Sequence, residues 1–119
     1  MILETHNLTK RFGKFQAVNQ INLSIPEGSI FGLLGPNGSG KTTTLGMLLG
    51  VINPSSGSFS WFDEGNAPQI RKSIGAILEQ PIFYPYLSAM QNLEIVCKIK
   101  QVETNRIDAV LEQVNLLDR

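Results

Sequence analysis

Gly35-Pro36-Asn37-Gly38-Ser39-Gly40-Lys41-Thr42 stands near the start of a chain of 119 residues. The pattern, G-x-x-x-x-G-K-T, is that of a loop that binds the phosphates of a nucleotide. Its glycines tolerate positive φ and lack a Cβ, so a polyphosphate can lie against a nest of backbone N–H groups. A helix that begins near Lys41 adds the positive end of its dipole. We expect Lys41 to contact the β- and γ-phosphates and the Thr42 hydroxyl to hold Mg²⁺.

The residues on both sides supply the strand and the helix that such a loop requires. Residues 30–34, which read IFGLL, are apolar and predict a buried strand. Residues 43–49 predict a helix that ends at Gly50, and its apolar face consists of Leu45, Leu48 and Leu49. The alternative interpretation is a glycine-rich turn that binds nothing. A strand, a glycine-rich loop and a helix in this order favour the phosphate site.

Composition limits the possible partners and compartments. The chain has 10 Lys and Arg and 10 Asp and Glu, so its charge gives no case for nucleic-acid or anionic-membrane binding. The single cysteine, Cys97, excludes an internal disulfide, fits a reducing compartment and has apolar neighbours that predict a buried thiol. We see neither a secretory leader nor an apolar run near the roughly 20 residues that span a bilayer. We therefore expect a soluble, cytoplasmic chain of at most one domain, which meets a membrane only through a partner.

Two strands are expected ahead of the loop. Residues 1–8 predict the first. Residues 19–25 alternate strictly and predict a half-buried antiparallel strand whose apolar face consists of Ile21, Leu23 and Ile25. His6 has no second ligand near it in the sequence and is expected at the surface or at a sheet edge. Phe12 lies between the two strands and has two interpretations: it caps a small core, or it stands exposed and stacks on a flat heteroaromatic ring.

The segment after the loop helix predicts two more strands and a short helix. Residues 57–62 alternate, with Phe59 and Trp61 on one side, and residues 73–79 form a short apolar run; both segments predict strands. Pro68 is placed to open a short helix through residue 72. Residues 80–87 form a loop with three aromatics, which are Phe83, Tyr84 and Tyr86. These aromatics either pack within the loop or form a surface that docks a protein, and the sequence does not separate the two interpretations.

Two helices are expected toward the C-terminus. Ser88 and Gln91 have the spacing of a capping box, and apolar residues follow at helical spacing from Met90. A second helix, with Thr104 as its cap, is predicted by apolar residues that repeat at three and four positions: Ile107, Val110, Leu111, Val114 and Leu117.

In combination, these motifs resemble the N-terminal half of the nucleotide-binding domain of ABC transporters, from about Leu3 to the end of the chain. Residues 8–13, LTKRFG, look like the family's A-loop, whose aromatic stacks on adenine; this favours an adenine contact for Phe12, although Tyr is more usual there. Residues 35–43 are similar to the family's Walker A motif. The resemblance implies that Val18 packs beside the base or ribose and that Thr43 bonds the α-phosphate. The residues expected to bind ATP are Phe12, Val18, Asn37, Gly38, Ser39, Gly40, Lys41, Thr42 and Thr43.

The family's Q-loop is where this chain departs from the pattern. In an alignment on Pro81, Glu79 stands where the family has a glutamine, and Gln80 follows it. A glutamate there resembles the branch of peptide-antibiotic and lantibiotic export or immunity ATPases. Its anionic oxygens suit Mg²⁺ better than an amide does, but they are less favourable near the γ-phosphate. The expected metal ligands are therefore Thr42 and Glu79, with Gln80 as the alternative, and the resemblance implies that Lys41 and Glu79 take part in catalysis.

The resemblance implies an α/β fold: a P-loop NTPase core of the ABC ATPase type, with an antiparallel β-subdomain and the start of a helical subdomain, the C-terminal half being absent. Residues 1–34 and 57–79 would form the β-subdomain and core strands, residues 35–50 the loop and its helix, and residues 80–119 the Q-loop and the beginning of the helical subdomain. The implied cofactors are ATP and Mg²⁺. The implied partners are a membrane permease, contacted through the Q-loop and helical subdomain, and a second nucleotide-binding domain; no nucleic acid is expected. Such a protein lies in the cytoplasm, against the inner face of the cell membrane.

The resemblance also implies that the family's signature motif, Walker B strand, catalytic glutamate, D-loop and switch histidine would follow Arg119. We therefore expect this fragment to bind nucleotide at most, and ATP hydrolysis coupled to export only in the full-length protein. Without its neighbours, a strand at residues 30–34 would have unpaired apolar edges that favour aggregation. Two alternatives remain. Neutral charge disfavours a non-transport ABC protein of translation or DNA repair, and Phe12 with its antiparallel strands disfavours an unrelated P-loop kinase or GTPase.

Overall fold

The structure is a computed structural model that describes residues 1–77 and 83–118. It divides into two compact units, Met1–Ile74 and Gly75–Arg119, which are described separately. The first unit holds the sheet and the phosphate-loop sequence, and the second holds two helices. No helix in residues 1–77 and 83–118 is long and apolar enough to cross a bilayer.

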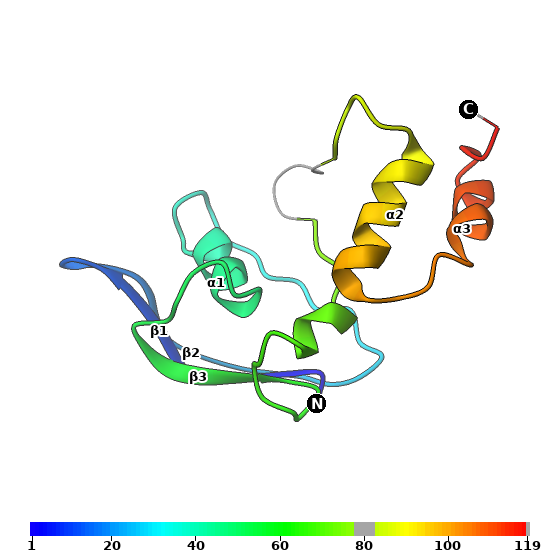
Figure 1. Cartoon of the computed structure of the whole chain (residues 1–119). Coiled ribbons are helices and arrows are strands. Elements are labelled where there is room, and N and C mark those ends of the chain that lie inside the picture. The colour runs from blue at the N-terminus through cyan, green and yellow to red at the C-terminus, as the bar shows by residue number, and fades with distance from the viewer. Residues whose placement is uncertain (78–82, 119) are drawn as a thin grey trace. The chain divides into compact units, whose positions relative to one another are not determined.

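The first unit is built on an antiparallel sheet with the strand order β2-β1-β3 (Figure 1). Its strands are β1 (Leu3–Phe12), β2 (Phe15–Ile25) and β3 (Ser56–Trp61). The predicted alternation of residues 19–25 is confirmed, with apolar side chains half-buried and polar ones exposed. Both β1 and β2 extend further than predicted, because pairing continues to Phe12 opposite Phe15 through residues that show no clear alternation. Cross-strand hydrogen bonds, which the sequence pattern does not show, hold that part of the hairpin together.

Two buried threonines satisfy backbone groups where the β1–β2 pairing changes register. The register shifts after Thr5 and again after Leu8. Thr5 Oγ1 donates to the Ile21 carbonyl at 2.9 Å and accepts from the Leu23 N–H at 2.8 Å. Thr9 Oγ1 accepts from the Gln20 N–H at 3.0 Å. Each hydroxyl replaces a ladder bond that the irregular pairing cannot make, so the hairpin keeps its backbone satisfied.

The helix α1 (Lys41–Leu48) packs on one face of this sheet (Figure 1). The core that they share consists of Leu3, Leu8, Val18, Met47, Leu48 and Phe59. The predicted apolar face of the helix is partly wrong, because Leu45 is exposed while Met47 is fully buried. Gly46 lies on the buried side of the helix: a Cβ there would lie 2.7 Å from Ile52 Cδ1, so the missing side chain lets Ile52 pack against the helix. Trp61 Nε1 of β3 donates to the Leu48 carbonyl at 2.9 Å and ties the sheet to the end of α1.

Neither of the two short apolar runs forms a strand in the residues that the structure describes. Residues 30–34 have no strand structure, and Ile30 and Leu34 are almost fully exposed. Residues 74–77 also have none, and Ser73 ends the 3₁₀ helix η1 (Ile70–Ser73), which replaces the predicted helix at 68–72. The remainder of the second predicted strand lies outside the described residues. The prediction of a buried strand at residues 30–34 is wrong: a buried strand needs neighbouring strands as well as apolar residues, and no described strand pairs with either run.

The second unit contains α2 (Ala89–Lys100) and α3 (Ile107–Gln113). The predicted capping box is confirmed: Ser88 Oγ accepts from the Gln91 N–H at 3.1 Å, and Gln91 Oε1 accepts from the Ser88 N–H at 2.9 Å. The predicted cap at Thr104 is wrong, because α3 begins after Arg106 and has no side-chain cap; the Thr104 carbonyl instead accepts from the Ile107 N–H at 3.2 Å. Cys97 is half-buried, and α2 has no fully buried residue, so the buried thiol is also not observed.

Candidate functional site

The loop before α1 has the backbone conformation that an anion nest requires. Gly38 and Gly40 have φ of 84° and 98°, values that side chains with a Cβ rarely adopt. Gly40 is the N-cap of α1 and provides no side-chain cap, so the N–H groups of the first turn point toward whatever lies at this end of the helix. The Ser39 N–H bonds the Pro36 carbonyl at 3.1 Å, which closes the loop on itself. The geometry therefore fits a bound anion.

Strand β2 supports the loop directly beneath Gly40. A Cβ at Gly40 would lie 2.5 Å from the Ala17 carbonyl oxygen and 3.4 Å from Val18 Cγ2. Glycine is thus required at this position both for its φ and for its lack of a side chain. Val18 is only 3% exposed and belongs to the core. The contact of Val18 with a base or ribose stays a prediction, whereas its packing beneath the loop is a feature of the structure.

The other loop residues lie where a phosphate could reach them. Lys41 begins α1, and its Nζ donates to the Gly35 carbonyl, so the ammonium group lies over the loop of which it is part. Thr42 is exposed and Thr43 is half-buried. Sequence reasoning overlooked Thr44, which is buried and whose Oγ1 donates to the Gly40 carbonyl at 2.8 Å. Thr44 fixes the junction between loop and helix, and its position four residues after Gly40 was the available signal. The three other predicted loop residues, Asn37, Gly38 and Ser39, are exposed.

Phe12 ends β1 at the tip of the β1–β2 hairpin. It is 52% exposed, which excludes the interpretation of Phe12 as a core residue. Lys10 Nζ lies 5.1 Å from the centroid of its ring and also donates to the Asn53 carbonyl at 2.8 Å. Phe15, the cross-strand partner of Phe12, is 64% exposed and was not singled out from the sequence. The two-residue turn at Gly13 was the signal that could have paired the two aromatics. A contact between Phe12 and a base stays a prediction.

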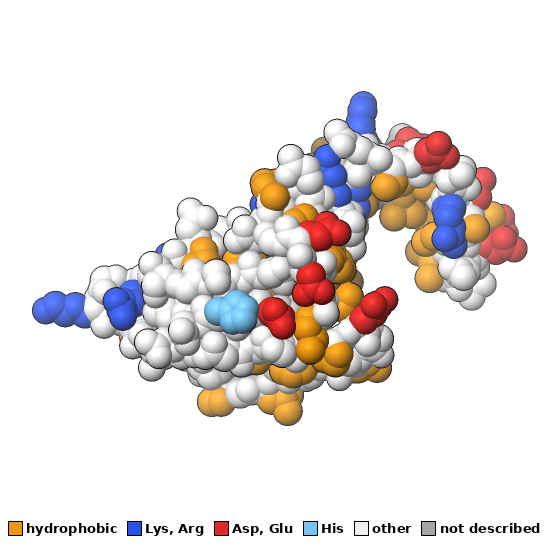
Figure 2. Space-filling view, turned by 90° about the horizontal axis from the view of Figure 1, so that it is seen from below, with side chains coloured by type: hydrophobic (Ala, Val, Ile, Leu, Met, Phe, Trp, Pro, Cys, Tyr) orange, Lys and Arg blue, Asp and Glu red, His pale blue; other side chains and the backbone are white. Residues whose placement is uncertain are grey.

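The predicted metal ligands are only partly placed. Glu79 and Gln80 lie outside the described residues, so of the predicted ligands only Thr42 is seen. Within residues 1–77 and 83–118, no group of three or more His, Cys, Asp and Glu side chains could hold a metal ion. His6 is exposed, as predicted, and its Nε2 lies 3.8 Å from Glu4 Oε2; Figure 2 shows the histidine at the surface beside acidic side chains.

The aromatic loop of the second unit has internal order. The Tyr84 and Tyr86 rings lie edge to face with centroids 5.8 Å apart. Asn92 of α2 accepts from the Tyr84 N–H at 2.8 Å and donates to the Ser88 carbonyl at 2.9 Å, so it holds the loop to the helix. Phe83 and both tyrosines nevertheless stay exposed. Packing within the loop is thus observed, and a docking role stays a prediction.

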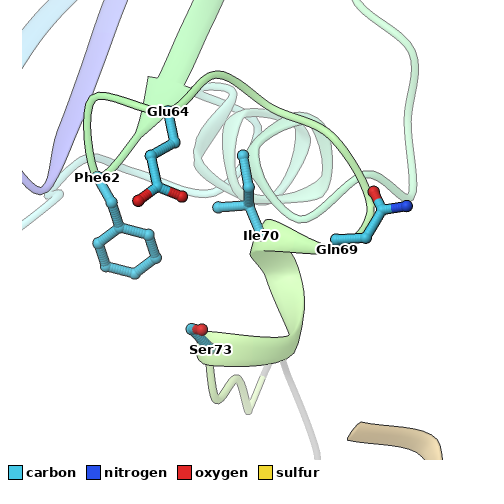
Figure 3. Close-up of a pocket in the computed structure, with 5 residues that line it drawn as sticks. All are labelled: Phe62, Glu64, Gln69, Ile70 and Ser73. Carbon is cyan, nitrogen blue, oxygen red and sulfur yellow. The ribbon is translucent and has the colours of Figure 1, made fainter. Parts of the chain in front are cut away.

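A hollow of about 510 Å³ lies in the first unit, away from the phosphate-loop sequence (Figure 3). Phe62 and Glu64, from the turn after β3, face it from one side. Gln69, Ile70 and Ser73 line it from η1 and the residue before that helix. None of these five residues belongs to the predicted site, so the hollow plays no part in the nucleotide hypothesis.

Curated relatives carry names that match the predicted branch. The chain is 45% identical over 119 residues to the bacitracin transport ATP-binding protein BcrA of Bacillus licheniformis, a match that covers 97% of this chain and 39% of the relative. It is 35% identical over 115 residues to the lantibiotic transport ATP-binding protein SrtF of Streptococcus pyogenes, with 97% of this chain and 50% of the relative covered. The chain thus spans between about two fifths and one half of the length of these relatives. The resemblance to the peptide-antibiotic and lantibiotic branch is confirmed.

Solved structures confirm the expected fold class. A structure described as the ATP-binding subunit of an ABC transporter matches with a TM-score of 0.87 at 22% identity, over 100% of this chain and 52% of that one. The dimeric structure of the ATP-binding cassette MJ0796, described as a post-hydrolysis state bound to ADP and Pi, matches with a TM-score of 0.69 at 27% identity, over 82% of this chain and 47% of that one.

The family model described as ABC transporter matches residues 18–119, which include the glycine loop, α1, β3 and both helices of the second unit. On this match, the chain belongs to the ABC transporter family.

Proposed function

We propose that this chain contributes the phosphate- and base-binding part of the ATP-binding subunit of an ABC transporter, which couples ATP binding and hydrolysis to the export of a small molecule or peptide. The observation that carries the proposal is the junction at Gly40, where a residue of φ 98° caps α1 without a side chain and Lys41 lies over the loop. The names of the bacitracin and lantibiotic transport relatives support the export of a peptide-like compound.

The residues present fit a triphosphate. Two glycines of positive φ turn the loop, the helix end has no side-chain cap, and an ammonium group stands within the loop. We expect Lys41 to exchange its bond with the Gly35 carbonyl for bonds to β- and γ-phosphate oxygens, which are charge-assisted and therefore stronger. The Thr43 hydroxyl would bond the α-phosphate, and the amides of residues 38–43 would surround the anion.

Mg²⁺, when bound, would neutralise the charge that develops during phosphoryl transfer. Thr42, an exposed residue of the first turn of α1, would hold it through its hydroxyl. Glu79 would be the second protein ligand, and Lys41 and Glu79 would act in catalysis. A nucleotide-bound structure with Gln80 at the Mg²⁺ and Glu79 turned away would contradict the assignment of Glu79.

Hydrolysis and transport are proposed only for a complete subunit with its partners. Phosphoryl transfer requires charge stabilisation on both sides of the γ-phosphate, and the glycine loop with Lys41 would supply one side. The dimeric structure of the relative bound to ADP and Pi supports a second nucleotide-binding domain as the source of the other. The remaining partner would be a membrane permease, contacted through the Q-loop and the helical subdomain, with the subunit in the cytoplasm against the membrane.

Isothermal titration calorimetry with Mg-ATP tests the nucleotide site. We expect saturable binding that Lys41→Ala weakens by about tenfold or more, because a hydrogen bond to a charged group contributes roughly 1.5–3 kcal/mol. Lys98→Ala, which removes an exposed lysine of α2, is the matched control and should leave the affinity unchanged. Phosphate release by the unaltered chain should stay negligible. Absence of binding, or equal affinity for the Lys41 variant, would overturn the proposal.

A further inference from the structure

Two phenylalanines are exposed side by side at the tip of the β1–β2 hairpin. Phe12 and Phe15 are cross-strand partners on either side of the two-residue turn, and they are 52% and 64% exposed. Side chains of directly paired residues lie on the same face of a sheet, with Cβ atoms about 4.5–5.5 Å apart. Contiguous exposed apolar side chains are a feature of binding sites, whereas single ones are common on any protein surface. The hairpin tip therefore presents one continuous aromatic surface.

This surface lies on the side of the hairpin that faces the phosphate loop. Lys10 Nζ lies 5.1 Å from the Phe12 ring centroid, so Lys10 and Phe12 share a face. Lys10 is in turn the cross-strand partner of Val18, whose Cγ2 lies against the position of Gly40. Lys10 Nζ also reaches the Asn53 carbonyl in the loop that follows α1. The ring of Phe15, as the partner of Phe12, belongs to this same face.

We infer that Phe15 is a second base-binding residue and that Phe12 and Phe15 together form a platform on which a purine base stacks. The inference rests on the proposed nucleotide site and extends it, since the phosphates would lie in the loop above β2 and the base over the hairpin tip. Lys10 is held near Phe12 by the hydrogen bond from its ammonium group to the Asn53 carbonyl, and this ammonium group lies over the Phe12 ring. Phe15 carries no such neighbour among its described interactions and offers the larger exposed surface.

The chemistry of the platform determines which bases it distinguishes. Phenylalanine rings have no hydrogen-bond donor or acceptor, so they recognise a base by stacked area alone. A purine, with its two fused rings, can cover both phenylalanines, whereas a pyrimidine covers less. We therefore expect ATP and GTP to bind with similar affinity and CTP to bind more weakly.

The test compares nucleotides with inorganic tripolyphosphate, which can fill the glycine loop but has no base. Calorimetric titrations of the full chain with Mg-ATP, Mg-GTP, Mg-CTP and Mg-tripolyphosphate would be run on the unaltered chain, Phe15→Ala, Phe15→Tyr and Gln16→Ala. Gln16 is the neighbouring exposed residue of β2 and its side chain points to the other face of the hairpin, so its variant is the matched control. Because the Phe15 side chain is mostly exposed, its removal should leave the circular dichroism spectrum unchanged.

We expect Phe15→Ala to weaken ATP and GTP binding at least about fivefold while tripolyphosphate binding stays unchanged, since one base–aromatic stack is commonly worth this much or more. Phe15→Tyr should retain the affinity, and Gln16→Ala should resemble the unaltered chain. Unchanged ATP binding by Phe15→Ala, or an equal loss for ATP and tripolyphosphate, would overturn the platform and leave the proposed function standing. If the unaltered chain binds neither ATP nor tripolyphosphate, the proposed function fails and the platform fails with it.

Discussion

Gly40 connects the sheet, the loop and the helix at a single residue. Its φ of 98° turns the chain into α1, and its missing side chain leaves room for the Ala17 carbonyl. Gly38 has a similar φ of 84°, but a Cβ there would meet nothing within 4 Å. A side chain at Gly38 would therefore add backbone strain alone, whereas a side chain at Gly40 would add both backbone strain and a clash with β2.

Gly40→Ala should be considerably more harmful than Gly38→Ala. Both alanines would adopt an unfavourable φ, at a cost of about 1–3 kcal/mol each. The Gly40 variant must additionally move the loop away from β2, so we expect a larger loss of unfolding free energy and a weaker tripolyphosphate affinity. Urea denaturation and calorimetry measure the two effects. Equal losses of unfolding free energy for the two variants would show that the close approach of the Ala17 carbonyl to Gly40 does not contribute to the effect.

Among the elements, α2 and α3 offer a matched comparison of helix starts. The start of α2 carries a complete capping box between Ser88 and Gln91, whereas α3 begins without a side-chain cap three residues beyond the threonine chosen from the sequence. A cap is thus present at one Ser/Thr position and absent at the other.

Ser88→Ala should destabilise the second unit by about 1 kcal/mol, because the alanine leaves the Gln91 N–H without its acceptor. Thr104→Ala is the control and should have an effect near zero, since no capping bond of its side chain is described. Hydrogen exchange of the α2 amides and thermal unfolding both report the difference. A loss for the Thr104 variant as large as that for Ser88 would contradict the helix boundary.

Some parts of the fold could be predicted from the sequence. Sequence patterns predicted the structure correctly where all the interacting residues lie in one short stretch, as in the Ser88 capping box, the turn around Gly38 and Gly40 and the alternation in β2. They failed at Thr104, where the helix begins later than its local signal indicates, and in segments whose structure depends on distant partners. Residues 30–34 are apolar enough for a strand, yet strand formation needs neighbours that their own letters do not specify.

The residues of the candidate site also divide into those that the sequence predicted and those that it did not. The glycine loop and Lys41 were predicted because the motif is contiguous, and the structure places them together at the start of α1. Phe15 and Thr44 were missed. The role inferred for Phe15 arises from its pairing with Phe12 across the hairpin, and that of Thr44 from a bond to Gly40. The turn at Gly13 and the four-residue spacing from Gly40 hint at these contacts, but the fold is needed to establish them.

At the scale of the whole molecule, the exposed apolar run at residues 30–34 is a segment through which we expect the chain to self-associate. Ile30 and Leu34 are almost completely exposed in the described part of the first unit. A segment of this composition that lacks paired neighbours is prone to associate with another copy.

Ile30→Lys should reduce self-association, because burial of one large aliphatic side chain contributes roughly 1.5–3 kcal/mol, or about tenfold or more in an association constant. Val51→Lys is the control, since Val51 is also exposed but lies in a turn outside the run. Sedimentation velocity over a range of concentrations measures the change. An equal improvement with Val51→Lys would indicate a general effect of added charge and not association through residues 30–34.

The most direct measurement is an NMR titration of the ¹⁵N-labelled chain with Mg-ATP, followed residue by residue. If backbone amides of residues 38–43 surround a triphosphate, their resonances should shift together and saturate, and those of Phe12 and Phe15 should shift with the same dissociation constant. Tripolyphosphate should shift the loop amides alone. Loop amides that stay unmoved at saturating Mg-ATP in a folded chain would contradict the nucleotide site.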